Sequence, residues 1–272
     1  MSRTAKEREV AETFDQQYKL VQTNVMVAIE RDACGSDYGG TSWTTKVEAD
    51  RVTRLLRLAP GDRLLDIGSG AGWPGLYLAR TSGCDVALTD LPFPGLQIAA
   101  KRAVTDRLGG ACWITAADGV ALPFADDTFD GISHSDVLCC LPNKHAVLSA
   151  CRRTIRTSGR MVFSVISIAP GLSDVGQESA VANGPPYIET DTAYATLLEQ
   201  TGWRMTDCID ITEDFVATVR RVVEAQQVYE AALRDQIGAT ETVHRIVTMK
   251  DRLAAREAGV HRRELYVAVP AQ

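Results

Sequence analysis

The feature that most constrains this chain is a glycine-rich turn between an apolar run and a helical pattern, LLDIGSGAGWPGLYLAR at residues 64–80. The apolar run ends near Asp66, and apolar residues later resume with a helical period. Between them glycines occupy alternate positions, at Gly68, Gly70 and Gly72. Glycine adopts positive φ and has no side chain to hold a ligand off. The helix N-terminus that follows favours anionic groups, so the pattern predicts a ligand lying against the backbone.

Short apolar runs alternate with helical segments from residue 63 onward, which is typical of βαβ units and a mostly parallel sheet. The expected strands lie at residues 63–67, 85–90, 111–116, 130–135, 161–166, 203–211 and 264–270. The expected helices lie near residues 75–82, 95–107, 144–156 and 191–201, with longer ones at 213–237 and 240–258. We therefore expect a Rossmann-like α/β fold, with a seven-stranded, mostly parallel sheet and helices on both faces.

The N-terminal part of the chain precedes this pattern and has a character of its own. We expect residues 1–59 to form a helical cap or substrate lid over a domain of residues 60–272. The cap is predicted as a helix, a glycine-rich loop and a second helix, at residues 5–32, 33–45 and 46–58. Two cover helices at about 213–258 are inserted before the last strand. Residues 169–187 contain Gly-Pro-Pro and are predicted to be a long connection.

Composition narrows the function classes. The chain has 272 residues with a net charge of −6, which argues against a duplex nucleic-acid binder. It has no run of eighteen apolar residues and no apolar signal core, so we expect a cytoplasmic protein without a membrane span. Seven cysteines, with no C-x-x-C pair, argue against a disulfide framework and a zinc site. We expect no bound metal.

Two further acids follow the expected strands beside the glycine-rich turn. Asp90 ends the second strand, twenty residues after Gly70, where a carboxylate can accept both hydroxyl protons of a ribose. Asp118 follows the third strand, where an acid with a neighbouring N–H can hold an adenine edge. A dinucleotide G-x-G-x-x-G fingerprint would need glycine where Trp73 stands. That departure, and the lack of a clear Tyr-x-x-x-Lys pair, count against an NAD-dependent oxidoreductase.

Together, LLDIGSGAGWPGLYLA, Asp90, ADGVALPFADDTFDGI and SDVLCCLPN resemble the class I S-adenosylmethionine (SAM)-dependent methyltransferases, in particular their small-molecule branch. The resemblance covers about residues 60–168 and extends more loosely to 270. It implies an antiparallel last strand, SAM as cofactor and S-adenosylhomocysteine as product. The cofactor-binding residues that it implies are Asp66, Gly68, Ser69, Gly70, Gly72, Asp90, Leu91, Asp118, Gly119, Ser133 and His134.

The resemblance also implies a separate role for each acidic residue among these cofactor-binding residues. Asp66 orients the turn or the cofactor's amino group, Asp90 binds the ribose hydroxyls, and Asp118 meets the adenine edge. Two departures from the family pattern stand out. Trp73 replaces a small or charged residue, and a cysteine pair beginning at Cys139 stands where histidines are frequent.

Methyl transfer from a sulfonium is a direct displacement, in which the protein aligns the acceptor and excludes water. A hydroxyl acceptor, which we slightly favour, benefits from a base. His134, at the end of the fourth strand, is the best placed histidine, and Asp136 is its expected orienting partner. Candidate acceptor-binding residues are Tyr38, Trp43, Thr44, Cys139 and Tyr187.

The sequence therefore predicts a methyltransferase for a small organic acceptor, with no nucleic-acid partner. The long helices near the C-terminus are also of the kind that form homodimer faces. A SAM- or nucleotide-binding regulator or partner subunit without turnover stays open, because the glycine-rich turn and Asp90 would serve it equally well.

Overall fold

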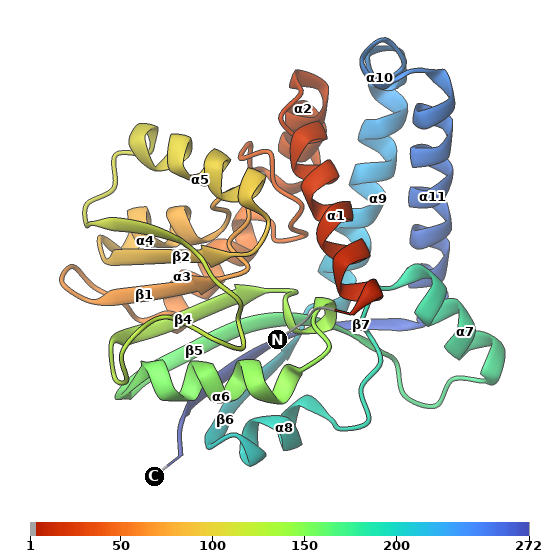
Figure 1. The fold of residues 1–272 in the computed structure, drawn as a ribbon. Coiled ribbons are helices and arrows are strands. Elements are labelled where there is room, and N and C mark those ends of the chain that lie inside the picture. The colour runs from red at the N-terminus through yellow and green to blue at the C-terminus, as the bar shows by residue number, and fades with distance from the viewer. Residues whose placement is uncertain (1–3, 272) are drawn as a thin grey trace.

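A seven-stranded sheet forms the centre of the computed structural model, which describes residues 4–271 (Figure 1). The strands are β1 (Arg63–Ile67), β2 (Asp85–Asp90), β3 (Cys112–Ala116), β4 (Phe129–Ser135), β5 (Ile155–Ile168), β6 (Trp203–Asp210) and β7 (His261–Pro270). Their order in the sheet is β3-β2-β1-β4-β5-β7-β6, and β7 runs antiparallel to both of its neighbours. The expected mostly parallel sheet and its reversed last strand are confirmed.

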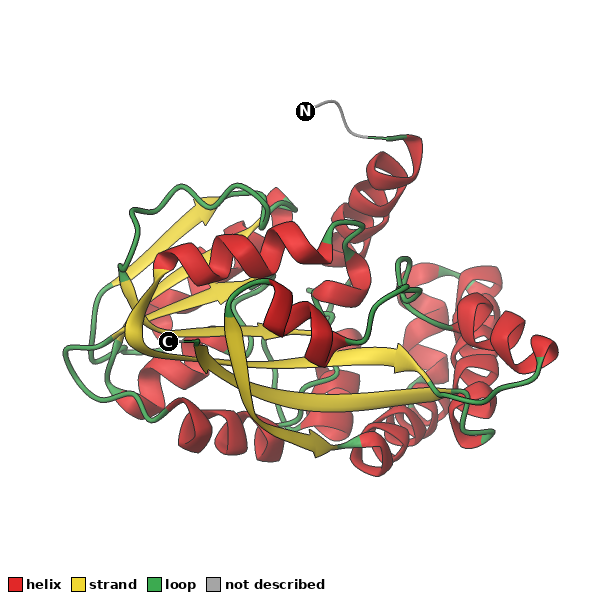
Figure 2. Cartoon of the chain, turned by 90° about the horizontal axis from the view of Figure 1, so that it is seen from below, coloured by secondary structure: helices red, strands yellow, loops and turns green. Residues whose placement is uncertain are grey.

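Helices cover both faces of this sheet. One face carries α3 (Lys46–Leu56), α4 (Gly75–Ser82) and α5 (Phe93–Thr105), and the other carries α6 (Lys144–Thr154) and α8 (Tyr194–Gln200). Figure 2 views the molecule from below and shows helices lying across that second face. Alternate strand residues divide between two apolar clusters: Leu64 joins the first and Leu65 the second. This alternation is what a strand buried on both faces produces.

The N-terminal cap contains one more helix break than the periodicity predicts. Residues 5–32 were expected as one helix, but α1 (Ala5–Leu20) ends before α2 (Asn24–Cys34), and Thr23 between them is extended. The apolar faces of α1 and α2 contribute Tyr18 and Ile29 to a cluster that also includes Ala71 of the glycine-rich turn. The cap is thus packed directly onto that turn.

Two expectations for the later part of the chain are wrong. The expected helix 213–237 is divided at Tyr229 into α9 (Thr212–Val228) and α10 (Glu230–Ile237), and α11 (Ala239–Glu257) follows. The expected open connection contains α7 (Asp174–Asn183), whose start is capped by the Ser173 hydroxyl. Only Ala180 of α7 is buried, so the segment lacks the apolar stripe that would have predicted a helix.

The cover helices stand beside the cap above one end of the sheet, where α9 packs against both α2 and α11 (Figure 1). The division at residue 59 stays a prediction, and residues 1–3 and 272 lie outside the described part of the chain. Between residues 4 and 271, no helix is long and apolar enough to cross a membrane.

Candidate active site

The glycine-rich turn connects β1 to α4 and has the backbone that its sequence predicts. Gly68, Gly70 and Gly72 have φ angles of 64°, 50° and 94°, a region that disfavours other residues. A Cβ atom on Gly70 would overlap the hydroxyl group of Tyr18, so α1 approaches the main chain of the turn closely. The Ser69 N–H donates to the carbonyl of Thr89 on β2 at 3.0 Å, which fixes the turn against the next strand.

Asp90 ends β2 and holds the same turn from the side. Its Oδ2 accepts a hydrogen bond from the Gly70 N–H at 2.8 Å, and its Oδ1 accepts one from the Leu91 N–H at 2.7 Å. Burial raises the pKa of this carboxyl to about 6, so it is ionised at neutral pH. An ionised carboxylate has further lone pairs and can accept additional hydroxyl donors at this edge.

Asp66 links the first and fourth strands beneath the turn. Its Oδ1 accepts a hydrogen bond from the Ser133 hydroxyl at 2.6 Å, and its Oδ2 lies against Gly75 at the start of α4. The side chain is buried, and burial raises the pKa of Asp66 to about 7. A Cβ at Gly75 would collide with this carboxylate, so that glycine is required by the approach of α4.

Asp118 and Gly119 complete an acidic edge. They follow β3, and the loop is tied to β2 because the Ala117 N–H donates to the Asp90 carbonyl at 3.0 Å. Asp118 accepts from the Val120 N–H at 3.2 Å, and Gly119 packs near Ile67. The carboxyl ends of three adjacent parallel strands thus carry Asp66, Asp90 and Asp118, as the sequence predicts.

His134 lies in a different environment from the one expected. It belongs to β4, its side chain is 1% exposed, and its ring stacks on Phe163 with centroids 4.5 Å apart. Neither ring nitrogen has a hydrogen-bond partner among the described residues. Burial lowers the pKa of His134 to about 3, so the imidazole is neutral at physiological pH. The expected pairing with Asp136 is absent.

Asp136 instead binds Arg263 of β7, which sequence reasoning missed. Both carboxylate oxygens of Asp136 accept from Arg263 Nε, at 3.0 and 3.1 Å. The same guanidinium donates to Glu48 of α3 at 2.7 and 2.9 Å. Burial alone would lower the pKa of Arg263, but the two carboxylates raise it above its ordinary value. The sequence did contain a signal for this buried arginine. Side chains two residues apart in a strand lie on the same face, so Arg263 shares the buried face of Leu265.

The candidate acceptor-binding residues divide into two groups. Thr44, Trp43 and Cys139 lie around the Asp136–Arg263 pair. The Thr44 hydroxyl accepts from Arg263 at 3.3 Å, Cys139 Sγ donates to the Asp136 carbonyl at 3.1 Å, and Trp43 packs on Phe215 beside Arg263. These three candidate residues therefore gather near the end of β4.

Tyr187 joins this group through its main chain, whereas Tyr38 does not. The Tyr187 N–H donates to the Cys139 carbonyl at 3.0 Å. Tyr38 donates its hydroxyl proton to Asp106, the residue just after α5, and packs against Trp73. Trp73, the departure from the family pattern, is buried, and its indole N–H donates to the Thr44 carbonyl at 2.8 Å. Through this hydrogen bond, Trp73 holds the cap loop that contains Thr44.

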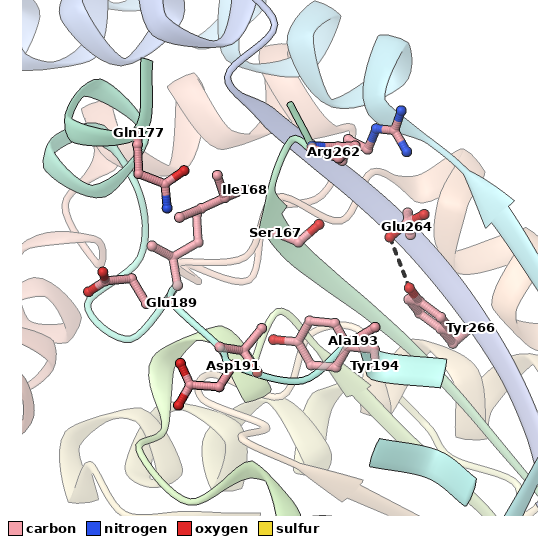
Figure 3. Close-up of a pocket in the computed structure, with 13 residues that line it drawn as sticks. Ser167, Ile168, Gln177, Glu189, Asp191, Ala193, Tyr194, Arg262, Glu264 and Tyr266 are labelled. Carbon is pink, nitrogen blue, oxygen red and sulfur yellow. Dashed lines mark hydrogen bonds between the residues drawn. The ribbon is translucent and has the colours of Figure 1, made fainter. Parts of the chain in front are cut away.

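An open hollow of about 380 Å³ lies apart from the acidic edge, beyond the end of β5 (Figure 3). Tyr194 and Ser167 both line it, and the Tyr266 hydroxyl donates to Glu264 at 2.9 Å. None of the predicted cofactor or acceptor residues lines this hollow. The edge at Asp90 is instead covered by Tyr18 of α1, so the two places are distinct.

Comparison with known proteins agrees with this geometry. A family model described as a methyltransferase domain matches residues 65–163. Methyltransferase GfsG of Streptomyces halstedii is 26% identical over 239 residues, which is 84% of each protein. An O-methyltransferase of Pyrenophora dematioidea is 27% identical over 217 residues, which is 75% of this chain and 79% of that protein. Phosphoethanolamine N-methyltransferase 2 of Haemonchus contortus has a similar structure, with a TM-score of 0.78 at 17% identity, over 95% of this chain and 60% of its own.

The sheet order, with its antiparallel last strand, is typical of the Rossmann-like fold of methyltransferases. The chain is a SAM-dependent methyltransferase, and it is similar to the class I methyltransferases that act on small molecules. The third and least favoured interpretation, an NAD-dependent oxidoreductase, is thereby set aside.

Proposed function

We propose that this enzyme binds SAM along the edge formed by β1, β2 and β3 and methylates a hydroxyl group of a small organic acceptor. The observation that carries the proposal is the hydrogen bond from the Gly70 N–H to the Asp90 carboxylate at that edge. Main chain without Cβ atoms lies beside an ionised carboxylate, which suits a ligand with a polyhydroxylated ring and a charged tail. When bound there, SAM supplies an electrophilic methyl group.

Each residue of the edge has a proposed task. Asp90 accepts the ribose hydroxyls, with Leu91 beside the adenine, and Asp118 with the neighbouring Gly119 N–H holds the adenine edge. The main chain at Gly68, Ser69 and Gly72 supports the ribose and the methionine tail. Asp66 is held by Ser133 and sets the position of the turn beneath them.

The cap excludes water from this edge. Tyr18 is buried against Gly70 and Gly95, and its hydroxyl lies 3.3 Å from the Thr41 hydroxyl in the cap loop. Helix α1 is therefore seated over the turn, and we infer that it must shift for the cofactor to enter. Closure of a cap that removes water is a common way to protect a reactive electrophile.

The chemical step is proposed to rest on alignment of the acceptor. A buried, neutral His134 whose pKa is about 3 is a poor acceptor for a hydroxyl proton. We therefore propose that His134 supports Phe163 and the end of β4, and that Trp43, Thr44 and Cys139 shape the acceptor side. The similarity to an O-methyltransferase supports a hydroxyl acceptor.

The test is product formation. The purified chain is incubated with SAM and a panel of phenols, alcohols, amines and carboxylic acids, and S-adenosylhomocysteine is measured by mass spectrometry. Acceptor-dependent product with hydroxyl compounds supports the proposal. Product only with amines would overturn the choice of oxygen, and no turnover together with SAM binding would favour a regulator or partner subunit.

A further inference from the structure

Three arginines of α11 share one helical face and lack a carboxylate partner. Arg245, Arg252 and Arg256 are spaced by seven and four residues, which places them on the same side of the helix. None of them belongs to an ion pair within residues 4–271. Burial lowers the pKa of Arg245 and of Arg256, and the charge of Arg252 lowers both further.

Arg256 is the most deeply buried of the three. Its side chain is 4% exposed, and its Nε has no hydrogen-bond partner. One terminal nitrogen donates to the carbonyl of Arg252 at 2.7 Å. Burial lowers the pKa of Arg256 only to about 10, so it stays charged at neutral pH. A buried charge without a counter-ion is destabilising, and a bound anion would relieve that cost.

This charge lies at the acceptor side of the site. The Arg256 guanidinium is 4.8 Å from the ring centroid of Phe215 and 5.7 Å from that of Trp43. The charge of Asp136 acts against burial and raises the pKa of Arg256, but the Asp136 carboxylate is already bound to Arg263.

The local charges add up to a positive excess. Glu48 and Asp136 carry two negative charges against Arg263 and the three arginines of α11. Glu241, which is exposed on the same helix, also acts on Arg245. Arg51 also acts on Glu48, so the local balance is positive, and both Arg245 and Arg252 are half-buried rather than fully solvated. Half-buried guanidinium groups suit planar or tetrahedral anions, which they bind through paired N–H donors.

We propose that the acceptor carries an anionic group, a carboxylate or a phosphate, that binds to Arg256, Arg252 and Arg245. The group would be held by α11 while the atom to be methylated points toward the end of β4. This inference rests on the proposed function, because it assigns the substrate class of the same site. It requires no covalent step of its own.

The test measures anion binding without turnover. Inorganic pyrophosphate and succinate are titrated calorimetrically into the full chain saturated with S-adenosylhomocysteine, at constant ionic strength in chloride. Saturable binding of one of them is expected, and the probe that binds distinguishes a phosphate from a carboxylate. Arg256→Gln and Arg252→Gln should each weaken it about tenfold or more. The matched control Arg234→Gln, which is exposed on α10 and paired with Glu230, should leave it unchanged.

The cofactor measurement separates this inference from the proposed function. Unchanged S-adenosylhomocysteine affinity in Arg256→Gln shows that the variant is folded, and Arg252→Gln replaces it if it is not. No saturable binding of either anion, or equal affinity in wild type and the arginine variants, overturns the inference while leaving the methyltransferase proposal standing. Anion binding by a chain that does not bind S-adenosylhomocysteine would reject the cofactor assignment and keep the anion site.

Discussion

The carboxylate of Asp90 and the backbone N–H of Gly70, twenty residues apart in the chain, form a hydrogen bond of 2.8 Å. This contact exists because β1 and β2 are adjacent parallel strands whose carboxyl ends meet at one edge. It positions a charged side chain beside main chain that lacks Cβ atoms. The predictions below follow from this edge and from the buried charges near it.

Gly70→Ala should weaken cofactor binding in addition to lowering the free energy of unfolding. At a φ of 50° the substitution costs about 1–2 kcal/mol of stability, and the added Cβ collides with the Tyr18 hydroxyl. Gly61→Ala is the matched control, because Gly61 also has positive φ but its Cβ meets nothing within 4 Å. Denaturant unfolding and titration with S-adenosylhomocysteine measure both effects. Equal affinities in the two variants would show that the turn does not touch the cofactor.

Cofactor affinity should fall as the pH drops below about 6. Burial raises the pKa of Asp90 to about 6, and a protonated carboxyl loses acceptor capacity for ribose hydroxyls. The affinity should therefore be constant above this pH and decline below it, by about tenfold per unit at most. Asp90→Asn should bind weakly with no such decline. A decline that persists in Asp90→Asn but disappears in Asp66→Asn would assign the titration to Asp66, whose pKa is about 7.

Arg263→Met should destabilise the fold strongly. The substitution leaves Glu48 and Asp136 without their shared cation, and breaking a buried pair on one side costs about 3–5 kcal/mol. Arg220→Met removes an exposed ion pair and should cost less than about 1 kcal/mol. Urea unfolding compares the two. A loss below about 1 kcal/mol for Arg263→Met would mean that water reaches the two carboxylates.

His134→Phe should keep methyl transfer largely intact. The phenyl ring can stack on Phe163 as the imidazole does, and neither nitrogen of His134 has a partner to lose. With a hydroxyl acceptor from the product screen, kcat and its pH profile should resemble those of wild type. A general base would contribute about 10²- to 10⁴-fold, so a drop of that size at unchanged cofactor affinity would restore the original hypothesis of a catalytic histidine.

Most strands, the turn at Gly68–Gly72 and the place of Asp90 were predictable, because they depend on local period and on the adjacency of successive parallel strands. The Asp136–Arg263–Glu48 contacts were not, since they join β4, β7 and α3, and strand direction is not visible in a single sequence. The break before Thr23 and the helix α7 were missed because they depend on tertiary packing and capping rather than on an apolar stripe.

The expected hydrogen bond between His134 and Asp136 is absent for a related reason. His134 and Asp136 are two residues apart, and their sequence proximity suggested a hydrogen bond. Strand β4 ends at Ser135, and the backbone direction changes there: Asp136 turns to Arg263 while His134 remains in the core. Two-residue spacing puts side chains on one sheet face only while the strand continues, and the φ of 56° at Asp136 ends that alternation.

The most direct test of the central claim is calorimetric titration of the chain with SAM, S-adenosylhomocysteine and NADH, repeated on Asp90→Ala and on the exposed-surface control Asp235→Ala. We predict that SAM and S-adenosylhomocysteine bind and NADH does not, and that Asp90→Ala weakens binding about tenfold or more while Asp235→Ala has no effect. Binding of NADH alone, or equal SAM affinity in Asp90→Ala and Asp235→Ala, would contradict the assignment of this edge to SAM.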